Sequence, residues 1–191
     1  MTTELGRPRD RRIDDAVLAA TAEMIGEVPY AELSVGAIAR RAGTSKPAIY
    51  RRWPSKAHLV HEAVFPIGEA TQIPATGSLA HDIREMVRRV AALLTTPAAR
   101  AAIPGLIAEM AADPTLHAAL LTRFGDVITR GLGDFLRDAV QRGDVRAGID
   151  AAELAEAVAG ITLLSLVTRP DAPDDGWLDR TATLITRGIA T

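Results

Sequence analysis

The stretch from Ala42 to Lys56 concentrates side chains that can donate hydrogen bonds to an anion. It reads AGTSKPAIYRRWPSK and holds two lysines, two arginines, a tyrosine and three small hydroxyl residues. Arginine and lysine bind phosphate oxygens and guanine edges, and a tyrosine hydroxyl can donate to a backbone phosphate. This combination indicates recognition of a polyanion rather than cleavage of a bond.

Residues suited to catalysis or metal binding are scarce elsewhere in the sequence. There is no cysteine, no Gly-rich phosphate loop, no nucleophile elbow and no HExxH motif. His58 and His61 have a spacing that suits two metal ligands, but no third ligand accompanies them. We therefore expect no enzyme, no cofactor and no metal site.

The composition favours an all-α protein. The chain has 191 residues, of which 48% are hydrophobic and only 4% aromatic, and it is rich in alanine and leucine. No segment reaches the ~18 uninterrupted apolar residues of a membrane span, so we expect a soluble, cytoplasmic protein without membrane contact.

The first 60 residues carry ten basic and seven acidic side chains. The remainder is acidic, which indicates that the front of the chain meets the polyanion.

Four helices are expected to position the basic stretch. Apolar spacing predicts a first helix from Arg11 to Glu27 and a short second helix from Val35 to Ala42. Gly43 then makes a turn, and Ser45 caps a third helix whose inner face holds Ile49 and Trp53. A fourth helix begins after Ser55.

Two short helices around a Gly-Thr turn predict a helix-turn-helix, whose second helix enters the major groove of DNA. The residues expected to face DNA are those off the inner face of the third helix and at the start of the fourth. They are Thr44, Ser45, Lys46, Pro47, Ala48, Tyr50, Arg51, Arg52 and Lys56. We assign Lys46 to a guanine edge or a phosphate, and Tyr50 and Lys56 to phosphates. The alternatives are that Tyr50 caps a small core and that the arginines only promote solubility.

The segment AELSVGAIARRAGTSKPAIYRRWPSKAHLV resembles the DNA-binding domain of the TetR family of bacterial regulators. The resemblance covers about residues 10–62. It implies a three-helix DNA-binding domain followed by a helical domain for ligand binding and dimerisation. It also implies that the last two helices form the dimer interface.

The N-terminal GRPRDRR is extended and cationic. Arg7 and Arg9 of such an arm can lie in a narrow minor groove, although a solubilising tail has the same composition. We expect residues 1–9 to form this arm, residues 10–62 the DNA-binding domain, and residues 63–191 the ligand-binding and dimerisation domain.

Helices are expected over 78–95, 97–112, 113–142, 150–168 and 177–189, which gives about nine in all. The segment AVAGITLLSLV is apolar on nearly every side, which favours burial between two subunits. Residues expected at a homodimer interface are Ile161, Leu164, Trp177, Thr181, Leu184 and Ile185. The alternative is that both helices are interior to a monomer.

Larger or polar-tipped residues of the intervening helices could line a ligand chamber, although such residues are also ordinary core. They are Met86, Val90, Met110, His117, Leu120, Phe124 and Ile128. Pro104-Gly105 could open the helical ring and admit the ligand.

The sequence therefore predicts a homodimeric regulator, most readily a repressor, that binds a double-stranded DNA operator and is released by a small-molecule effector. Two alternatives stay open: a DNA-binding regulator without a ligand, and a helical adaptor that does not bind DNA.

Overall fold

The computed structural model describes residues 11–66, 72–169 and 171–191, with the side chains of residues 123, 124 and 126–130 left out. Within these ranges the chain forms nine α-helices and one 3-10 helix, and the only β pairing is an isolated bridge between Val145 and Ala190. The fold is therefore all-α, as the composition predicts.

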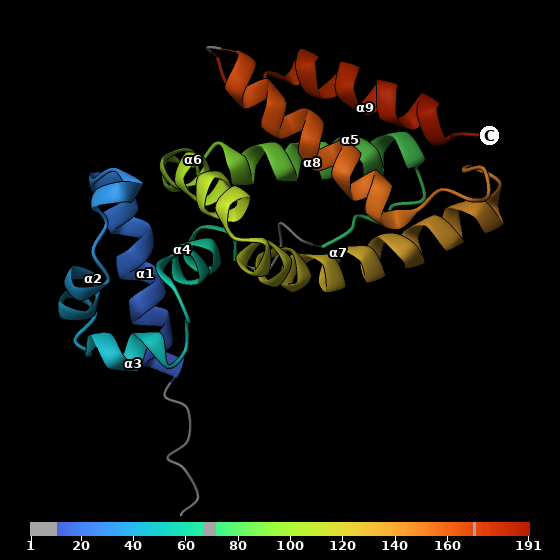
Figure 1. Ribbon diagram of the computed structural model, residues 1–191. Coiled ribbons are helices and arrows are strands. Elements are labelled where there is room, and N and C mark those ends of the chain that lie inside the picture. The colour runs from blue at the N-terminus through green and yellow to red at the C-terminus, as the bar shows by residue number, and fades with distance from the viewer. Residues whose placement is uncertain (1–10, 67–71, 170) are drawn as a thin grey trace, which may run out of the picture.

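The first five elements form a compact head at one end of the molecule (Figure 1). They are α1 (Arg11–Glu27), η1 (Tyr30–Glu32), α2 (Val35–Arg41), α3 (Lys46–Tyr50) and α4 (Lys56–Val64). The sequence analysis did not predict η1, a single turn that follows Pro29. Helix α3 is short because the chain turns at Arg51 and Arg52 before Pro54.

Five longer helices form the body (Figure 1). They are α5 (Leu79–Leu94), α6 (Pro97–Ala112), α7 (Pro114–Arg142), α8 (Ala151–Thr168) and α9 (Asp175–Ile189). The predicted bounds differ from these by no more than two residues. Helix α8 is long and apolar enough, by length and composition alone, to cross a membrane. In this fold one side of it packs against α5 and α7, and 22% of this apolar stretch is buried.

Local capping explains most of the helix starts. The side chains of Ser45, Ser55, Ser78 and Asp150 each accept a hydrogen bond from a backbone N–H in the first turn of the helix that follows. Gly43 ends the turn after α2 with a φ of 66°, a left-handed conformation that glycine adopts without strain.

The buried side chains form two apolar clusters. One joins α1 to α4 with Ala99, Ala102 and Leu106 of α6 and the start of α7, and the other joins α5, the second half of α7, α8 and α9. Helix α6 belongs to the body by sequence but completes the core of the head. Helix α6 is therefore in direct contact with the head.

A buried carboxylate fixes the segment that precedes α5. Asp82 is fully buried, and its oxygens accept hydrogen bonds from the Thr76 backbone N–H at 3.0 Å and from the Thr76 hydroxyl at 2.7 Å. These bonds satisfy the charge that burial would otherwise penalise. They hold the chain on which Ile73 lies against α5 and α7.

Candidate DNA-binding site and ligand cavity

Helix α3 is anchored from behind and open in front. Ile49 and Trp53 are almost fully buried in the head, and the Trp53 indole N–H donates to Glu62 Oε2 of α4 at 2.9 Å. The Ser45 hydroxyl accepts from the Ala48 N–H at 3.3 Å. Because both ends of the helix are held, its outer face has a fixed orientation.

The outer face of α3 carries most of the residues predicted to face DNA. Ser45, Lys46, Pro47, Tyr50 and Arg51 are exposed there, and Thr44 and Ala48 are half-buried beside them. The Lys46 ammonium lies 5.7 Å from the centre of the Tyr50 ring. The sequence prediction thus placed these seven residues on one surface, with two cations and a phenol hydroxyl available to an anion.

Arg52 has a structural partner within the head. Its guanidinium Nε lies 2.6 Å from Asp14 Oδ1 of α1, and 24% of its side chain is exposed. This partly buried ion pair fixes the position of α3 relative to α1. A guanidinium has five N–H donors, so a DNA contact of Arg52 remains a prediction.

Lys56 also has a partner within the head. Its ammonium donates to the backbone carbonyl of Tyr30 at 3.0 Å and lies 4.1 Å from the centre of the Tyr30 ring. A lysine has three N–H donors, so this bond leaves donors for a DNA phosphate. The phosphate contact of Lys56 remains a prediction, and Tyr30 becomes its positioning residue.

The metal and arm predictions have separate outcomes. His58 Nδ1 lies 2.9 Å from the Ser55 hydroxyl, within the cap of α4. No group of three metal-ligating side chains occurs in the described part of the chain. Arg7 and Arg9 lie outside the described residues.

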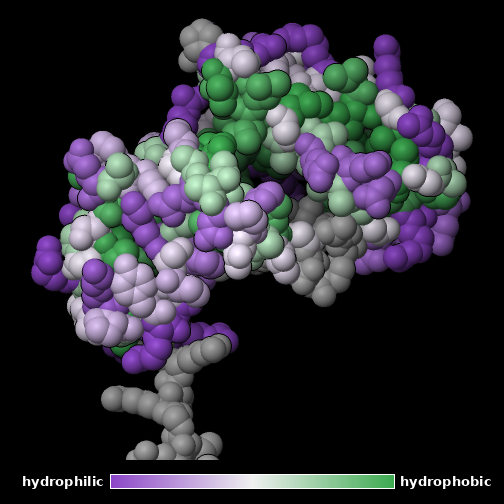
Figure 2. Space-filling view, viewed as in Figure 1, coloured by the Kyte–Doolittle hydropathy of each residue, from purple (hydrophilic) through white to green (hydrophobic). Residues whose placement is uncertain are grey.

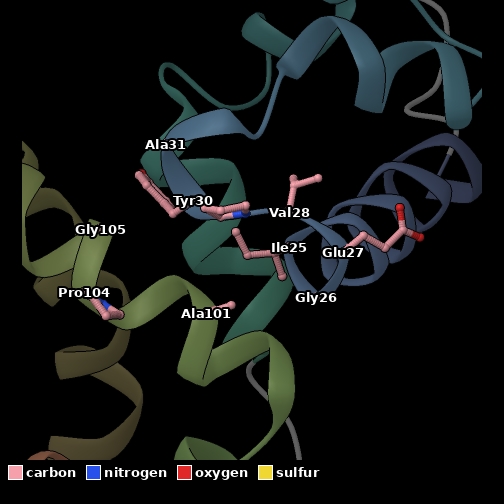
Figure 3. Close-up of a pocket in the computed structure, with 10 residues that line it drawn as sticks. Ile25, Gly26, Glu27, Val28, Tyr30, Ala31, Ala101, Pro104 and Gly105 are labelled. Atoms are coloured by element: carbon pink, nitrogen blue, oxygen red, sulfur yellow. The ribbon is translucent and has the colours of Figure 1, made fainter.

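Tyr30 connects the head to helix α6. Its ring is 7% exposed and lies directly on the backbone of Gly105, where an added Cβ atom would come within 2.2 Å of Tyr30 Cδ1. Tyr30 and Gly105 both line a groove between α6 and the end of α1 (Figure 3). Burial, with the Glu109 carboxylate nearby, raises the pKa of the Tyr30 hydroxyl above its usual range.

This contact changes the interpretation of Pro104-Gly105. Helix α6 continues through both residues from Pro97 to Ala112, so they do not open the helical ring. Gly105 instead allows an aromatic ring to approach the helix backbone. The sequence signal was a glycine inside a helical pattern, and its partner Tyr30 lies 75 positions earlier in the chain.

A cavity of about 310 Å³ lies in the body between α5, α7 and α8. Its lining is mainly apolar and includes Met86 and Val90, as predicted, together with Ile73, Leu121 and Leu132. Arg89, Glu156 and Gln72 are its larger polar residues. A concave, largely apolar site with few polar groups is the usual form of a small-molecule site.

The other predicted chamber residues do not line this cavity or are not described. Leu120 and Met110 pack in or against the cluster that completes the head, and His117 is exposed. The side chains of Phe124 and Ile128 lie outside the described part of the structure. The prediction missed the α8 wall, because the sequence analysis assigned this helix to the dimer interface and sought the chamber in the helices before it.

Comparison with known proteins decides the family. Residues 17–63 match the family described as bacterial regulatory proteins, tetR family, and residues 73–185 match the tetracyclin repressor-like C-terminal domain. The chain belongs to the TetR family. It is accordingly a DNA-binding helix-turn-helix transcriptional regulator and not an enzyme.

Similar TetR-family proteins span nearly the same length as this chain. The DNA-binding transcriptional repressor TetR of Mycobacteroides abscessus is 31% identical over 177 residues, covering 86% of this chain and 87% of its own. An HTH-type transcriptional regulator of Bacillus subtilis, YdeS, is 27% identical over 179 residues, covering 93% and 90%. The crystal structure of the TetR family transcription regulator SCO0332 superposes with a TM-score of 0.73 at 24% identity, covering 94% and 99%, which shows the shared fold.

The residues predicted at a dimer interface divide into two groups in this TetR-family chain. Trp177, Thr181 and Ile185 are buried inside the subunit by contacts among α5, α8 and α9. Their assignment is therefore corrected to the core. Leu164 and Leu184 are 62% and 66% exposed, and Ile161 is half-buried. Only these three remain available to a partner.

Proposed function

We propose that this TetR-family regulator is a homodimeric repressor that binds a palindromic operator and releases it when a small molecule occupies the α5–α7–α8 cavity. The observation that supports operator binding most directly is the outer face of α3, where Lys46, Tyr50 and Arg51 are exposed on a helix fixed from behind. Its length suits insertion of its N-terminal residues into a major groove.

An exposed apolar surface on α8 and α9 supports the homodimer. Leu164, Val167 and Leu184 are 62%, 73% and 66% exposed, and Figure 2 shows hydrophobic surface over α8. Contiguous exposed apolar side chains mark interaction surfaces. Two copies of α8 and α9 would form a four-helix bundle about a two-fold axis. The same surface explains why α8 is apolar on its outer side without a membrane, in keeping with a cytoplasmic regulator.

A dimer converts two weak DNA contacts into one specific site. The two α3 helices must lie about 34–36 Å apart to enter successive major grooves. A ligand that prefers a different separation of the heads lowers the affinity for DNA, because binding of the two partners is linked. The repressor direction is supported by the Mycobacteroides abscessus relative, which is a DNA-binding transcriptional repressor.

Selection of bound duplexes from a random pool tests the operator claim. We expect a palindrome with half-sites about one helical turn apart. Lys46→Ala should weaken binding and relax the preference at one base of each half-site, at about 1–3 kcal/mol per half-site. Arg137→Ala, which removes an exposed cation of α7, is the matched control and should bind as the parent does. Selection of a direct repeat, or of no sequence, would contradict the proposal.

The second candidate function is a DNA-binding regulator without an effector. The cavity favours a ligand-responsive protein, because a concave, largely apolar surface with a few polar groups is typical of small-molecule sites. A thermal-shift screen with small apolar compounds separates the two functions. Stabilisation by a compound that also lowers operator affinity supports the effector, and stabilisation by none supports the second candidate.

A further inference from the structure

The cavity between α5, α7 and α8 has a wall that determines which ligand fits it. Ala152, Ala155, Glu156 and Ala159 of α8 all line the cavity. Their spacing places them on one face of the helix. The three alanines have only methyl side chains, so they do not fill the cavity. Glu156 is the charged residue of α8 in the cavity lining.

The two charged residues of the lining differ in their partners. Arg89 Nε donates to Glu85 Oε1 at 2.8 Å, and its Nη1 donates to the Gln72 carbonyl at 2.9 Å. Two of its donors are therefore engaged, and it shares the Glu85 carboxylate with Arg88. Glu156 makes no hydrogen bond or ion pair with any described residue and is exposed at the rim of the cavity. Among the described lining residues, an anionic ligand would therefore meet an unpaired carboxylate and a single cation whose donors are partly engaged.

We infer that the effector is a monocationic amine on a compact apolar skeleton, with the amine at Glu156 and the skeleton against Met86, Val90 and Leu132. This inference rests on the proposed ligand-responsive function. A cavity of 310 Å³ is at the lower end of the ~300–1,000 Å³ range of ligand pockets, which favours a small effector. The exposed carboxylate lets the amine keep part of its hydration, so binding does not bury a bare charge.

The test compares matched probes on the full-length protein. Amine, alcohol and carboxylate forms of the phenethyl, hexyl and cyclohexylethyl skeletons differ in charge at nearly constant size. Their dissociation constants are measured by calorimetry, and release of the selected operator is measured in parallel. We expect the amine of at least one skeleton to bind about tenfold more tightly than its alcohol, and the carboxylate to bind most weakly.

Matched variants locate the preference. Glu156→Gln should remove the advantage of the amine while leaving the alcohol unchanged. Glu153→Gln makes the same change of charge three residues earlier on the same helix, at an exposed position outside the cavity, and should keep the advantage. Ala155→Leu and Ala159→Leu should reduce binding of every probe by filling the cavity, and circular dichroism identifies any variant that fails to fold.

Each remaining outcome overturns a defined claim. An amine preference that survives Glu156→Gln, or a preference for the alcohol or the carboxylate, overturns the inferred ligand class. If probes still release the operator in these cases, the proposed ligand-responsive function is retained and only the inferred amine class is rejected. If none of the nine probes binds or releases the operator, the inferred class fails, and the regulator without an effector becomes the better-supported function.

Discussion

Replacement of Gly105 by alanine tests whether Tyr30 joins the head to the body. An added Cβ atom would lie 2.2 Å from Cδ1, 2.4 Å from Cγ and 2.9 Å from Cβ of Tyr30. These distances are far shorter than the ~3.5–4.0 Å at which carbon atoms attract each other. The Tyr30 ring cannot simply rotate away, because its own Cβ is among the atoms in conflict. The 3-10 turn and α6 must therefore separate.

The size of the effect follows from two opposing terms. Overpacking a well-packed site costs about 1–3 kcal/mol, whereas replacing glycine by alanine inside a helix gains up to about 1 kcal/mol. Gly26, near the end of α1 on the same groove, has nothing within 4 Å of an added Cβ. Gly26→Ala is therefore the control, and the two variants should differ in unfolding free energy by about 1–3 kcal/mol.

Thermal and denaturant unfolding measure this difference, at about 2–4 °C per kcal/mol for a chain of this size. A double-mutant cycle with Tyr30→Ala isolates the contact, since removal of the ring should remove most of the cost of Gly105→Ala. Operator affinity should fall in Gly105→Ala and not in Gly26→Ala. Equal stability of Gly105→Ala and Gly26→Ala, or the same Gly105→Ala cost with and without the Tyr30 ring, would refute the contact.

Three other predictions concern the head and the dimer. Arg52→Ala should lower the free energy of unfolding, measured by thermal unfolding, by about 1 kcal/mol. In an Asp14→Ala background the same substitution should cause no further loss of stability, because only the ion pair between the two residues is removed. Tyr50→Phe should weaken binding to specific and unrelated duplexes alike in a fluorescence-anisotropy titration, since a phosphate contact carries no sequence information; a changed base preference would contradict this. Leu164→Arg and Leu184→Arg should each give a folded monomer by light scattering, because two-fold symmetry buries each new charge twice; dimers in both variants would move the interface elsewhere.

The sequence predicted the helices and the helix-turn-helix well because their determinants are local. Ser45 and Asp150 cap helices through bonds that span only a few residues, and Gly43 makes a turn that few other residues adopt without strain. The exposed face of α3 follows from the same local period, once Ile49 and Trp53 are assigned to the inside. A serine before a helix does not always cap it, because Ser34 precedes α2 without a side-chain bond to it.

The sequence could not predict which partner a side chain finds far along the chain. Arg52 and Asp14 are 38 positions apart, and periodicity alone cannot distinguish an arginine paired with α1 from one that faces DNA. In α9 the apolar stripe was identified correctly, but its direction was not. Trp177 and Ile185 face α5 inside the subunit, while Leu184, one residue earlier, faces outward. An apolar stripe indicates that one face of a helix is buried. It does not identify the element against which that face packs.

We expect the Tyr30 contacts to couple the proposed ligand cavity to the proposed DNA-binding surface within one subunit. Helix α6 lies in the chain between α5 and α7, which both line the cavity, so a ligand that separates those helices also shifts α6. Gly105 of α6 lies against the Tyr30 ring, and the Tyr30 carbonyl holds the Lys56 ammonium at 3.0 Å. A hydrogen bond weakens steeply as its geometry is lost. A displacement of α6 by an ångström is therefore felt by Lys56 at the start of α4, where the phosphate contact is proposed. We expect Lys56 to lose its fixed position before the core of the head is disturbed, because one charged bond yields more readily than the packed cluster around Ile49.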